Sequence, residues 1–368
     1  MKLANYSILL LIFFFSACTH EKAHEVQAEK AWKLELEKAD TLLRHSVESI
    51  DFLALEYSDK AALFNVNKLL HENNRYYLLD CRSNKIAAYD ADGMLQFVIN
   101  NRGAGPQEYL EIKSFAVDSL HIYTIDNYKH QLQVYSAYDG SFQAAKKLAF
   151  VAWDMAVLPD GHFIFSYIPF EQGEPSLPQD KYKLFITDKD LNIKKKLLKY
   201  TNGKFEFIGR DTYFTESEEG VVFNSVVSDD LYLFMNKDSV RHMKLNLSKG
   251  IPYEENPALK DVSDEGYNFL SRTPILHKSY LCCFVSEKDR LTDYLYNVST
   301  GQLSKNDYIY ALKGLLTPLT ATGDYLLSYL DDYSLYKDLV DNGFERADET
   351  VEKHLTNEGA VILKYKLK

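Results

Sequence analysis

The sequence has few of the residues that mark cross-linked, metal-stapled or nucleic-acid-binding proteins. It contains four cysteines in 368 residues and no Cys-x-x-Cys pair, which excludes a zinc ribbon and a disulfide-stapled scaffold. Its 42 basic residues are outnumbered by 53 acidic ones, and the formal net charge of −11 comes without a basic cluster. A nucleic-acid partner requires a positively charged stripe, so no nucleic-acid partner is predicted.

Glycine and proline are also sparse, at 16 and 9 residues, whereas tyrosine and phenylalanine are abundant, at 27 and 21. This usage favours β-strands over long loops or collagen-like segments. Hydrophobic residues make up 46% of the chain and charged residues 26%, as in ordinary globular proteins. The length suits one large all-β domain or two medium domains.

The N-terminus has the pattern of a secretory signal. Lys2 precedes an unbroken apolar run from Ile8 to Phe15, which is too short to span a bilayer comfortably. The small residues Ser16 and Ala17 follow, and then Cys18. We predict residues 1–17 to be a lipoprotein signal peptide and Cys18 to be the lipid attachment site, which would tether the protein without a membrane-spanning segment. The alternative is an ordinary signal peptide, and both place the mature chain outside the cytoplasm.

Residues 18–47 are predicted to be a lipid-anchored spacer. Within them, Glu21 to Arg44 is rich in Ala, Glu and Lys and contains neither Gly nor Pro. Such a composition favours a helical or partly frayed segment that holds the folded domain away from the lipid surface.

The remainder of the chain contains an internal repeat. A strand pattern ending at Asp80 recurs 46 residues later at Asp126, and the turn glycine Gly93 recurs 47 residues later as Gly140. A period near 45 residues with short strands and polar turns is typical of β-propeller blades. The sequence therefore predicts an all-β fold of this kind over residues 48–368.

We predict six four-stranded blades. The last one lacks a strand unless Ser49–Tyr57, near the mature N-terminus, supplies it and closes the ring, which removes exposed strand edges. Asp331–Asn357 interrupts this blade with a pattern that suits two short helices, and its place in the chain puts it on the face where the binding loops meet. There it could form a lid or partner surface, or cover the channel mouth. A pair of β-sandwich domains is the structural alternative.

One loop carries a family resemblance. Asn101–Tyr109 (NRGAGPQEY) is similar to the Gly-x-Gly-Pro-x-Glu-Tyr loop of six-bladed, NHL-like β-propeller lipoproteins of the cell envelope. The final strand, Val361–Lys368, also matches the end of that family. The resemblance implies the fold and a location in the cell envelope, with the outer membrane favoured. It implies no reaction, because the family has no generally assigned one.

The blade order predicts a binding site on one face of the ring, which we call the top face. The turns after the second strand of each blade and the crossings between blades meet there, and such funnel ends are where ligands usually bind. The predicted site consists of polar side chains from two of these turns and one crossing: Asp80, Arg82, Arg102, Glu108, Tyr109 and Asp126. The alternative is structural, with Asp80 and Asp126 capping their own turns.

No catalytic motif is present. The ten histidines include no His-Glu-x-x-His, and no Gly-x-Ser-x-Gly elbow occurs. Cys282 and Cys283 are adjacent on a strand and are predicted to pack rather than react. No cofactor is predicted, although a calcium ion held by several blades in the channel stays open.

The sequence therefore predicts a lipid-anchored, extracytoplasmic binding propeller whose partner is a glycan, a peptide or an envelope protein. The second reading is a metal-dependent propeller hydrolase or lyase with its site in the central channel.

Overall fold

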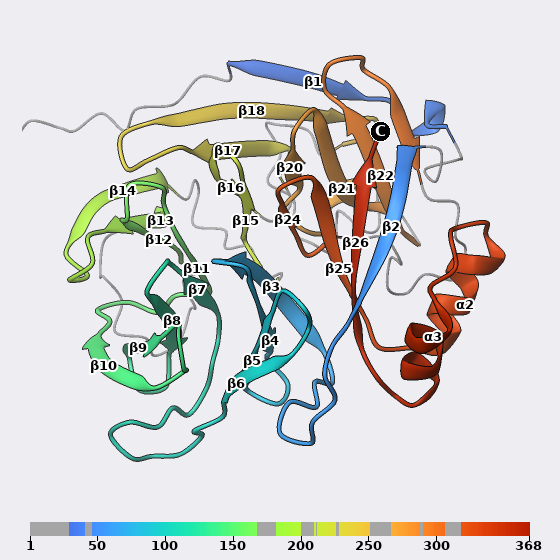
Figure 1. Cartoon of the computed structure of the whole chain (residues 1–368). Helices are drawn as coiled ribbons and strands as arrows, with labels where there is room; N and C mark the ends of the chain where they lie inside the picture. The colour runs from blue at the N-terminus through green and yellow to red at the C-terminus, as the bar shows by residue number, and fades with distance from the viewer. Residues whose placement is uncertain are drawn as a thin grey trace, which may run out of the picture.

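The computed structural model describes residues 29–40, 46–167, 182–199, 210, 212–225, 228–250, 266–287, 290–305 and 318–368. Six small sheets surround a common centre (Figure 1). The innermost strands contact one another in a closed circle, from the first sheet round to the sixth and back. The predicted six-bladed β-propeller is therefore confirmed.

Blades 1 to 3 follow the chain from the centre of the ring outwards. Blade 1 consists of β3 (Val66–Glu72), β4 (Arg75–Asp80), β5 (Lys85–Asp90) and β6 (Leu95–Ile99). Blade 2 consists of β7 (Phe115–Val117), β8 (His121–Asp126), β9 (Gln131–Ser136) and β10 (Phe142–Lys147). Blade 3 consists of β11 (Asp154–Val157), β12 (Phe163–Ser166), β13 (Tyr182–Thr187) and β14 (Ile193–Lys199).

Blades 4 to 6 are less regular. Blade 4 consists of β15 (Phe214–Ser217), β16 (Gly220–Asn224), β17 (Asp230–Phe234) and β18 (Val240–Leu247), with β1 (Lys30–Leu34) added outside. Blade 5 has two short inner strands, β19 (Phe269–Leu270) and β20 (Ile275–His277), beside β21 (Tyr280–Glu287), β22 (Arg290–Asn297) and β23 (Leu303–Lys305). Blade 6 consists of β24 (Thr320–Thr322), β25 (Tyr325–Leu330), β26 (Val361–Leu367) and β2 (Val47–Ala54).

The ring is closed by the N-terminal strand, as predicted. Strand β2 pairs antiparallel with β26, and Ile50 lies opposite Tyr365. Both side chains are buried in the hydrophobic cluster between blades 5 and 6. The last blade thus combines β2, from early in the chain, with three strands from its C-terminal part, and β2 covers the edge of β26.

The glycines of the repeat have a physical role. Gly93 and Gly140 end the turns between the third and fourth strands of blades 1 and 2, with φ angles of +80° and +71°. A β-carbon at Gly93 would lie 2.1 Å from the carbonyl oxygen of Ala54, and one at Gly140 would lie 2.4 Å from the ring of Phe97. Each turn therefore needs glycine for its left-handed backbone and for close contact with the outer strand of the preceding blade.

The described part of the predicted spacer contains no α-helix, only a strand and the short 3-10 helix η1 (Leu36–Lys38). Residues Lys30–Leu34 form β1, which pairs in parallel with β18 at the outer edge of blade 4. Trp32 and Leu34 are buried and the residues between and beside them are exposed, an alternation with the period of a strand. The chain then bridges from Asp40 to Ser304 of blade 5 before β2 joins blade 6. The charged, Ala-rich composition hid this alternation, because burial against a sheet edge outweighs helix propensity.

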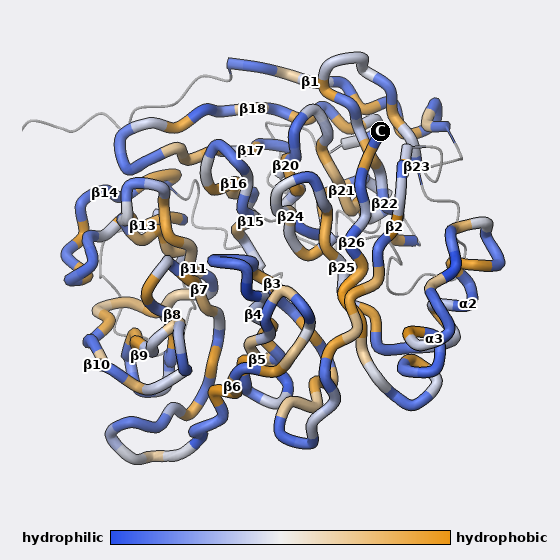
Figure 2. Tube along the Cα trace, viewed as in Figure 1, coloured by the Kyte–Doolittle hydropathy of each residue, from blue (hydrophilic) through white to orange (hydrophobic). Residues whose placement is uncertain are grey.

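The hydrophobic residues lie mostly between neighbouring blades. Six clusters of buried apolar side chains fill the spaces between them. Figure 2 shows hydrophobic segments along the strands and hydrophilic residues at many of the turns. Strand β15, which the sequence analysis missed, is short and contains Thr215, Glu216 and Ser217, so its period was too weak to recognise.

The insertion in blade 6 forms the two predicted helices, α2 (Tyr333–Asp341) and α3 (Glu349–Thr356). Their position differs from the prediction, since they pack on the outer side of blade 6 beside β2 rather than over the channel mouth (Figure 1). Tyr336 and Leu339 are buried in the blade 5–6 cluster, and the Tyr336 ring meets the Phe52 ring at 5.7 Å. Burial of this apolar face against β2 draws the helices to the rim. The described part of the chain contains no helix long and apolar enough to cross a membrane.

Candidate functional site

The two repeated aspartates hold the top face together. Asp80, at the end of β4, accepts hydrogen bonds from the backbone N–H groups of Phe64, Arg82 and Ser83 at 2.7 to 3.0 Å. Burial would raise the pKa of Asp80, but these donors outweigh it and hold the pKa below its usual value. In blade 2, Asp126 accepts from the N–H groups of Leu110 and Lys129 at 2.8 and 3.0 Å. Each carboxylate thus joins its own turn to the crossing that enters its blade.

The other predicted acid and the tyrosine also have internal partners. The carboxylate of Glu108 accepts a hydrogen bond from the N–H of Gly105 at 2.7 Å, and the backbone carbonyl of the same residue accepts one from Lys129 Nζ at 2.6 Å. Tyr109 is fully buried, and its hydroxyl donates to the carbonyl oxygen of Asn84 at 2.6 Å. Burial raises the pKa of the Tyr109 phenol well above its usual value. These contacts favour the structural alternative for Asp80, Asp126, Glu108 and Tyr109.

The two arginines point to a different use of the same loops. Arg82 is exposed, and among the described residues its guanidinium has no hydrogen-bond or ion-pair partner. Arg102 is also exposed, and its Nε donates to the carbonyl oxygen of Leu110 at 3.2 Å. The structure therefore brings the six predicted residues into neighbouring loops. Of the six, only the two arginines have side chains that are exposed to solvent.

Large apolar side chains are exposed in the same loops. Phe64, Leu110 and Tyr128 are 66%, 37% and 72% exposed. Phe64 and Leu110 are the residues whose N–H groups the two repeated aspartates bind, so the hydrogen bonds of Asp80 and Asp126 fix the backbone that presents them. We call Phe64, Arg82, Arg102, Leu110 and Tyr128 the top-face platform. Only its arginines were foreseen, because exposure of an apolar residue cannot be read from its type.

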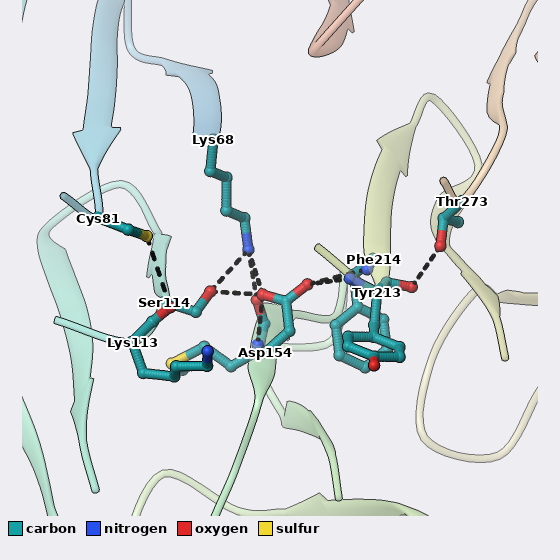
Figure 3. Close-up of polar contacts among 9 residues, drawn as sticks. Lys68, Cys81, Lys113, Ser114, Asp154, Tyr213, Phe214 and Thr273 are labelled. Carbon is teal, nitrogen blue, oxygen red and sulfur yellow. Dashed lines mark hydrogen bonds and ion pairs between the residues drawn. The ribbon is translucent and has the colours of Figure 1, made fainter. Parts of the chain in front are cut away.

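The centre of the ring contains a buried ion pair that the sequence analysis did not identify (Figure 3). Lys68 of β3 and Asp154 of β11 approach to 2.8 Å, with side chains 7% and 0% exposed. The second carboxylate oxygen of Asp154 accepts from the N–H groups of Tyr213 and Phe214 at 2.6 and 3.0 Å. One carboxylate therefore connects blades 1, 3 and 4 across the channel.

The remaining donors of this cluster are also used. Ser114 Oγ donates to Asp154 Oδ1, and Lys68 Nζ donates to the carbonyl of Met155 at 2.9 Å. Thr273, at blade 5, donates to the carbonyl of Tyr213 at 2.9 Å. Because the ammonium and the carboxylate are hydrogen-bonded within the protein, the cluster is suited to holding blades in place rather than to binding a ligand.

A cavity of about 440 Å³ lies at the channel mouth and extends between blades 5 and 6. Its apolar wall includes Phe284 and Leu295 of blade 5 and Leu326 of blade 6. Its polar wall includes Asn65, Arg210, Ser271, Arg272 and Asp293. A volume of this size, with mostly apolar walls and few polar groups, is typical of small-molecule sites. None of the six predicted binding residues lines it.

The inner strand of blade 5 is interrupted beside the cavity. β19 and β20 both pair with β21, and residues 271–274 between them belong to neither strand, although Ser271 still donates its N–H to the carbonyl of Phe284 at 2.8 Å. Pro274 lacks the N–H that a continuous strand would use, and Thr215 of blade 4 donates to its carbonyl at 2.7 Å. The cysteines behave as predicted for packing residues, since burial raises the pKa of both the Cys282 and the Cys283 thiol.

The structure does not test the predicted lipid site and gives no ligand set for a metal within the described ranges. Cys18 and the signal peptide lie outside the described residues. Among the residues that the structure describes, no group of three or more His, Cys, Asp or Glu side chains is arranged to hold a metal ion. The channel calcium ion therefore has no assignable ligand set in the described part and stays a prediction.

Comparison with known proteins gives a family. The model of the family described as Domain of unknown function (DUF4934) matches residues 33–361. The chain belongs to this family. No curated protein matches the chain.

Solved structures show the same fold at low sequence identity. A Bacteroides fragilis protein whose assigned name is that of an exported protein is 18% identical, with a TM-score of 0.72 over 92% of this chain and 99% of that one. A Bacteroides vulgatus member of the duf4221 family is 11% identical, with a TM-score of 0.50 over 88% and 97%. A streptogramin B lyase has a TM-score of 0.46 at 12% identity over 87% and 98%, which is too distant to support an activity.

Proposed function

We propose that this DUF4934 protein is a lipid-anchored, extracytoplasmic binding module that captures an acidic glycan on its top-face platform. One observation carries the proposal: Phe64 and Leu110 are exposed, and their N–H groups donate to the carboxylates of Asp80 and Asp126, which holds them beside arginines that extend into solvent. The extracytoplasmic location is supported by the signal-like N-terminus and by the assigned name of the Bacteroides fragilis protein of the same fold.

The chemistry of the platform suits a polymer with rings and negative charge. Exposed Phe64 and Tyr128 provide apolar faces on which sugar rings can pack. The local carboxylates of Asp80, Asp126 and Glu108 are already hydrogen-bonded to backbone N–H groups, whereas Arg82 and Arg102 are exposed. The charged side chains of the platform itself are the two arginines, in a protein with a formal net charge of −11.

The platform is also continuous and rigid. Asn84, in the turn of blade 1, accepts from the N–H of Ile112 at 2.9 Å through its side chain and from Tyr109 through its carbonyl. Asn127, in the turn of blade 2, donates to the carbonyl of Ala152 at 2.9 Å. Loops fixed in this way lose little conformational freedom when a ligand binds.

Binding of the mature protein to immobilised polygalacturonate, with neutral dextran as the comparison, tests the glycan. We expect binding to polygalacturonate alone, weakening as salt rises, because exposed charges are screened within about 8 Å at physiological ionic strength. Arg82→Ala with Arg102→Ala should lower affinity by roughly 10-fold or more. Phe64→Ala with Tyr128→Ala should also weaken binding.

Matched controls lie away from the platform. Leu120 and Tyr138 of blade 2 are 68% and 79% exposed, and their alanine variants should bind as the unaltered protein does. Equal losses in these controls, or no binding of polygalacturonate by the unaltered protein, would overturn the acidic glycan. Retained binding of an envelope protein or peptide in its place would assign the platform to that partner class.

The anchor has its own test. Cys18→Ala should move the protein from the membrane fraction to the soluble envelope fraction, because the acyl chains are the anchor we propose. Membrane association that persists after this change, in a chain whose signal peptide has been cleaved, would refute the tether.

A further inference from the structure

We propose that the cavity between blades 5 and 6 is a second site, for a small amphiphilic carboxylic acid that lies with its carboxylate at Arg272 and its apolar body between the blades. This site is separate from the top-face platform, and no residue of the platform lines it. The inference therefore stands or fails independently of the glycan proposal.

The interrupted strand supplies the recognition groups. Arg272 lies in the break between β19 and β20, is exposed, and has its guanidinium carbon 5.2 Å from the centre of the Phe284 ring. Among the described residues no carboxylate pairs with it. The adjacent Ser271 hydroxyl is buried and has no hydrogen-bond partner in the same set of residues. A buried hydroxyl without a partner is costly, and a ligand oxygen at the cavity mouth would satisfy it.

A second arginine lines the cavity. Arg210 is 7% exposed, and its guanidinium donates to Asn224 Oδ1 at 2.8 Å and to the carbonyl oxygen of Leu270. Leu270 directly precedes Ser271, so Arg210 lies beside the same break.

A buried acidic side chain also lines the cavity. Asp293 is 8% exposed and lies opposite Phe284 in the β21–β22 pair, two pairs nearer the top than Cys282 and Leu295. Burial is the main cause that raises the pKa of both the Cys282 thiol and the Tyr365 phenol. The negative charge of Asp293 raises both pKa values further, and Cys282 also contributes to that of Tyr365.

The remaining walls suit an apolar body. Leu295 and Leu326 belong to the hydrophobic cluster of blades 5 and 6, where close packing would otherwise fill the space. A cavity of about 440 Å³ within such a cluster can hold a ring or short acyl chain. The thiol of Cys282 is held neutral by its raised pKa, so it acts as part of this wall rather than as a nucleophile.

Calorimetric titration of the mature protein with 4-phenylbutyrate and with the neutral 4-phenylbutanamide tests the site. We expect the acid to bind at roughly millimolar concentration, the affinity that about a dozen non-hydrogen atoms supply, and more tightly than the amide. Arg272→Ala should weaken the acid roughly 10-fold and leave the amide unchanged. Arg290→Ala is the matched control, because Arg290 is exposed on the same blade, pairs with Glu287 at 3.5 Å and does not line the cavity.

A cavity-filling change provides the second arm. Cys282→Phe adds volume at the wall and should abolish binding of both probes, with circular dichroism and melting used to confirm that the variant is folded. If this variant does not fold, the comparison of Arg272→Ala with Arg290→Ala decides alone. Absence of acid binding by the unaltered protein, equal effects of the two arginine changes, or binding that survives in a folded Cys282→Phe protein would overturn the proposal. Polygalacturonate binding should be unchanged in all of these variants, which separates this outcome from that of the glycan proposal.

Discussion

Asp154→Ala should be the most destabilising single change in the channel. The Asp154 carboxylate neutralises the Lys68 ammonium at 2.8 Å and accepts from the N–H groups of Tyr213 and Phe214. Its loss leaves a cation that is 7% exposed and two backbone donors without their acceptor. Breaking one partner of a buried pair costs about 3–5 kcal/mol, and a buried donor left unsatisfied about 1–3 kcal/mol. We therefore expect a loss of about 4 kcal/mol or more in the free energy of unfolding.

Lys68→Met should cost less, because Asp154 keeps its hydrogen bonds from Ser114 and from the backbone. The double variant should be less destabilised than the sum of the two single variants by at least about 1 kcal/mol, since residues in direct contact are coupled. Urea unfolding, with the slope checked for constancy, measures all three. Because the pair is buried, raising the salt concentration should change these differences little. Additive effects, or an Asp154→Ala protein as stable as Lys68→Met, would refute the idea that this carboxylate holds the blades.

Three further changes test the frame around the sites. Asp80→Ala removes the acceptor of three backbone N–H groups and should lower the unfolding free energy by about 1–3 kcal/mol. Asp92→Ala, at an exposed turn residue, should not lower it, and thermal melting of the two variants makes the comparison. Ile50→Asp places a charge in the blade 5–6 cluster and should lower the unfolding free energy by at least about 3 kcal/mol. The exposed neighbour Asp51 is the control, and Asp51→Ala should change the unfolding free energy very little. Equal melting temperatures of the two variants would contradict the role of β2 in closure. Burial raises the pKa of Asp229 to about 7, and its Oδ1 has no partner among the described residues. The folded state then holds a proton that the unfolded state releases near pH 4, so this group lowers stability as pH rises from about 4 to 7. Asp229→Asn should therefore raise the melting temperature more at pH 8 than at pH 4, and an equal gain at both values would disprove the assignment.

The propeller ring could be predicted because its signals are local. The spacing from Asp80 to Asp126 and from Gly93 to Gly140 reflects turns whose backbone demands particular residues, and such demands recur with each blade. The closing strand β2 could be predicted for a related reason, since a blade that lacks a strand leaves an edge that the only spare strand must cover. The insertion helices were also readable, because a helical face repeats within a few residues.

Strand β1 and the position of the helices depended on partners far away in the chain. Lys30–Leu34 is a strand because the edge of β18, more than two hundred residues away, offers hydrogen bonds and burial for Trp32. The same applies to α2 and α3, which lie at the rim because β2 presents Phe52 there. The composition of a local segment cannot reveal a strand edge that forms only after the ring closes.

The sequence by itself determined the blade repeat, the ring closure and the loops that meet on the top face. Only the tertiary structure decided what those loops do: four of the six predicted residues bind within the protein, while Arg82 and Arg102 remain exposed beside Phe64 and Tyr128. It likewise decided the cavity, whose lining joins the break in the inner strand of blade 5 to residues of blade 6 that lie far away in the chain. Burial and exposure are properties of packing, and packing between blades joins residues that no local pattern connects.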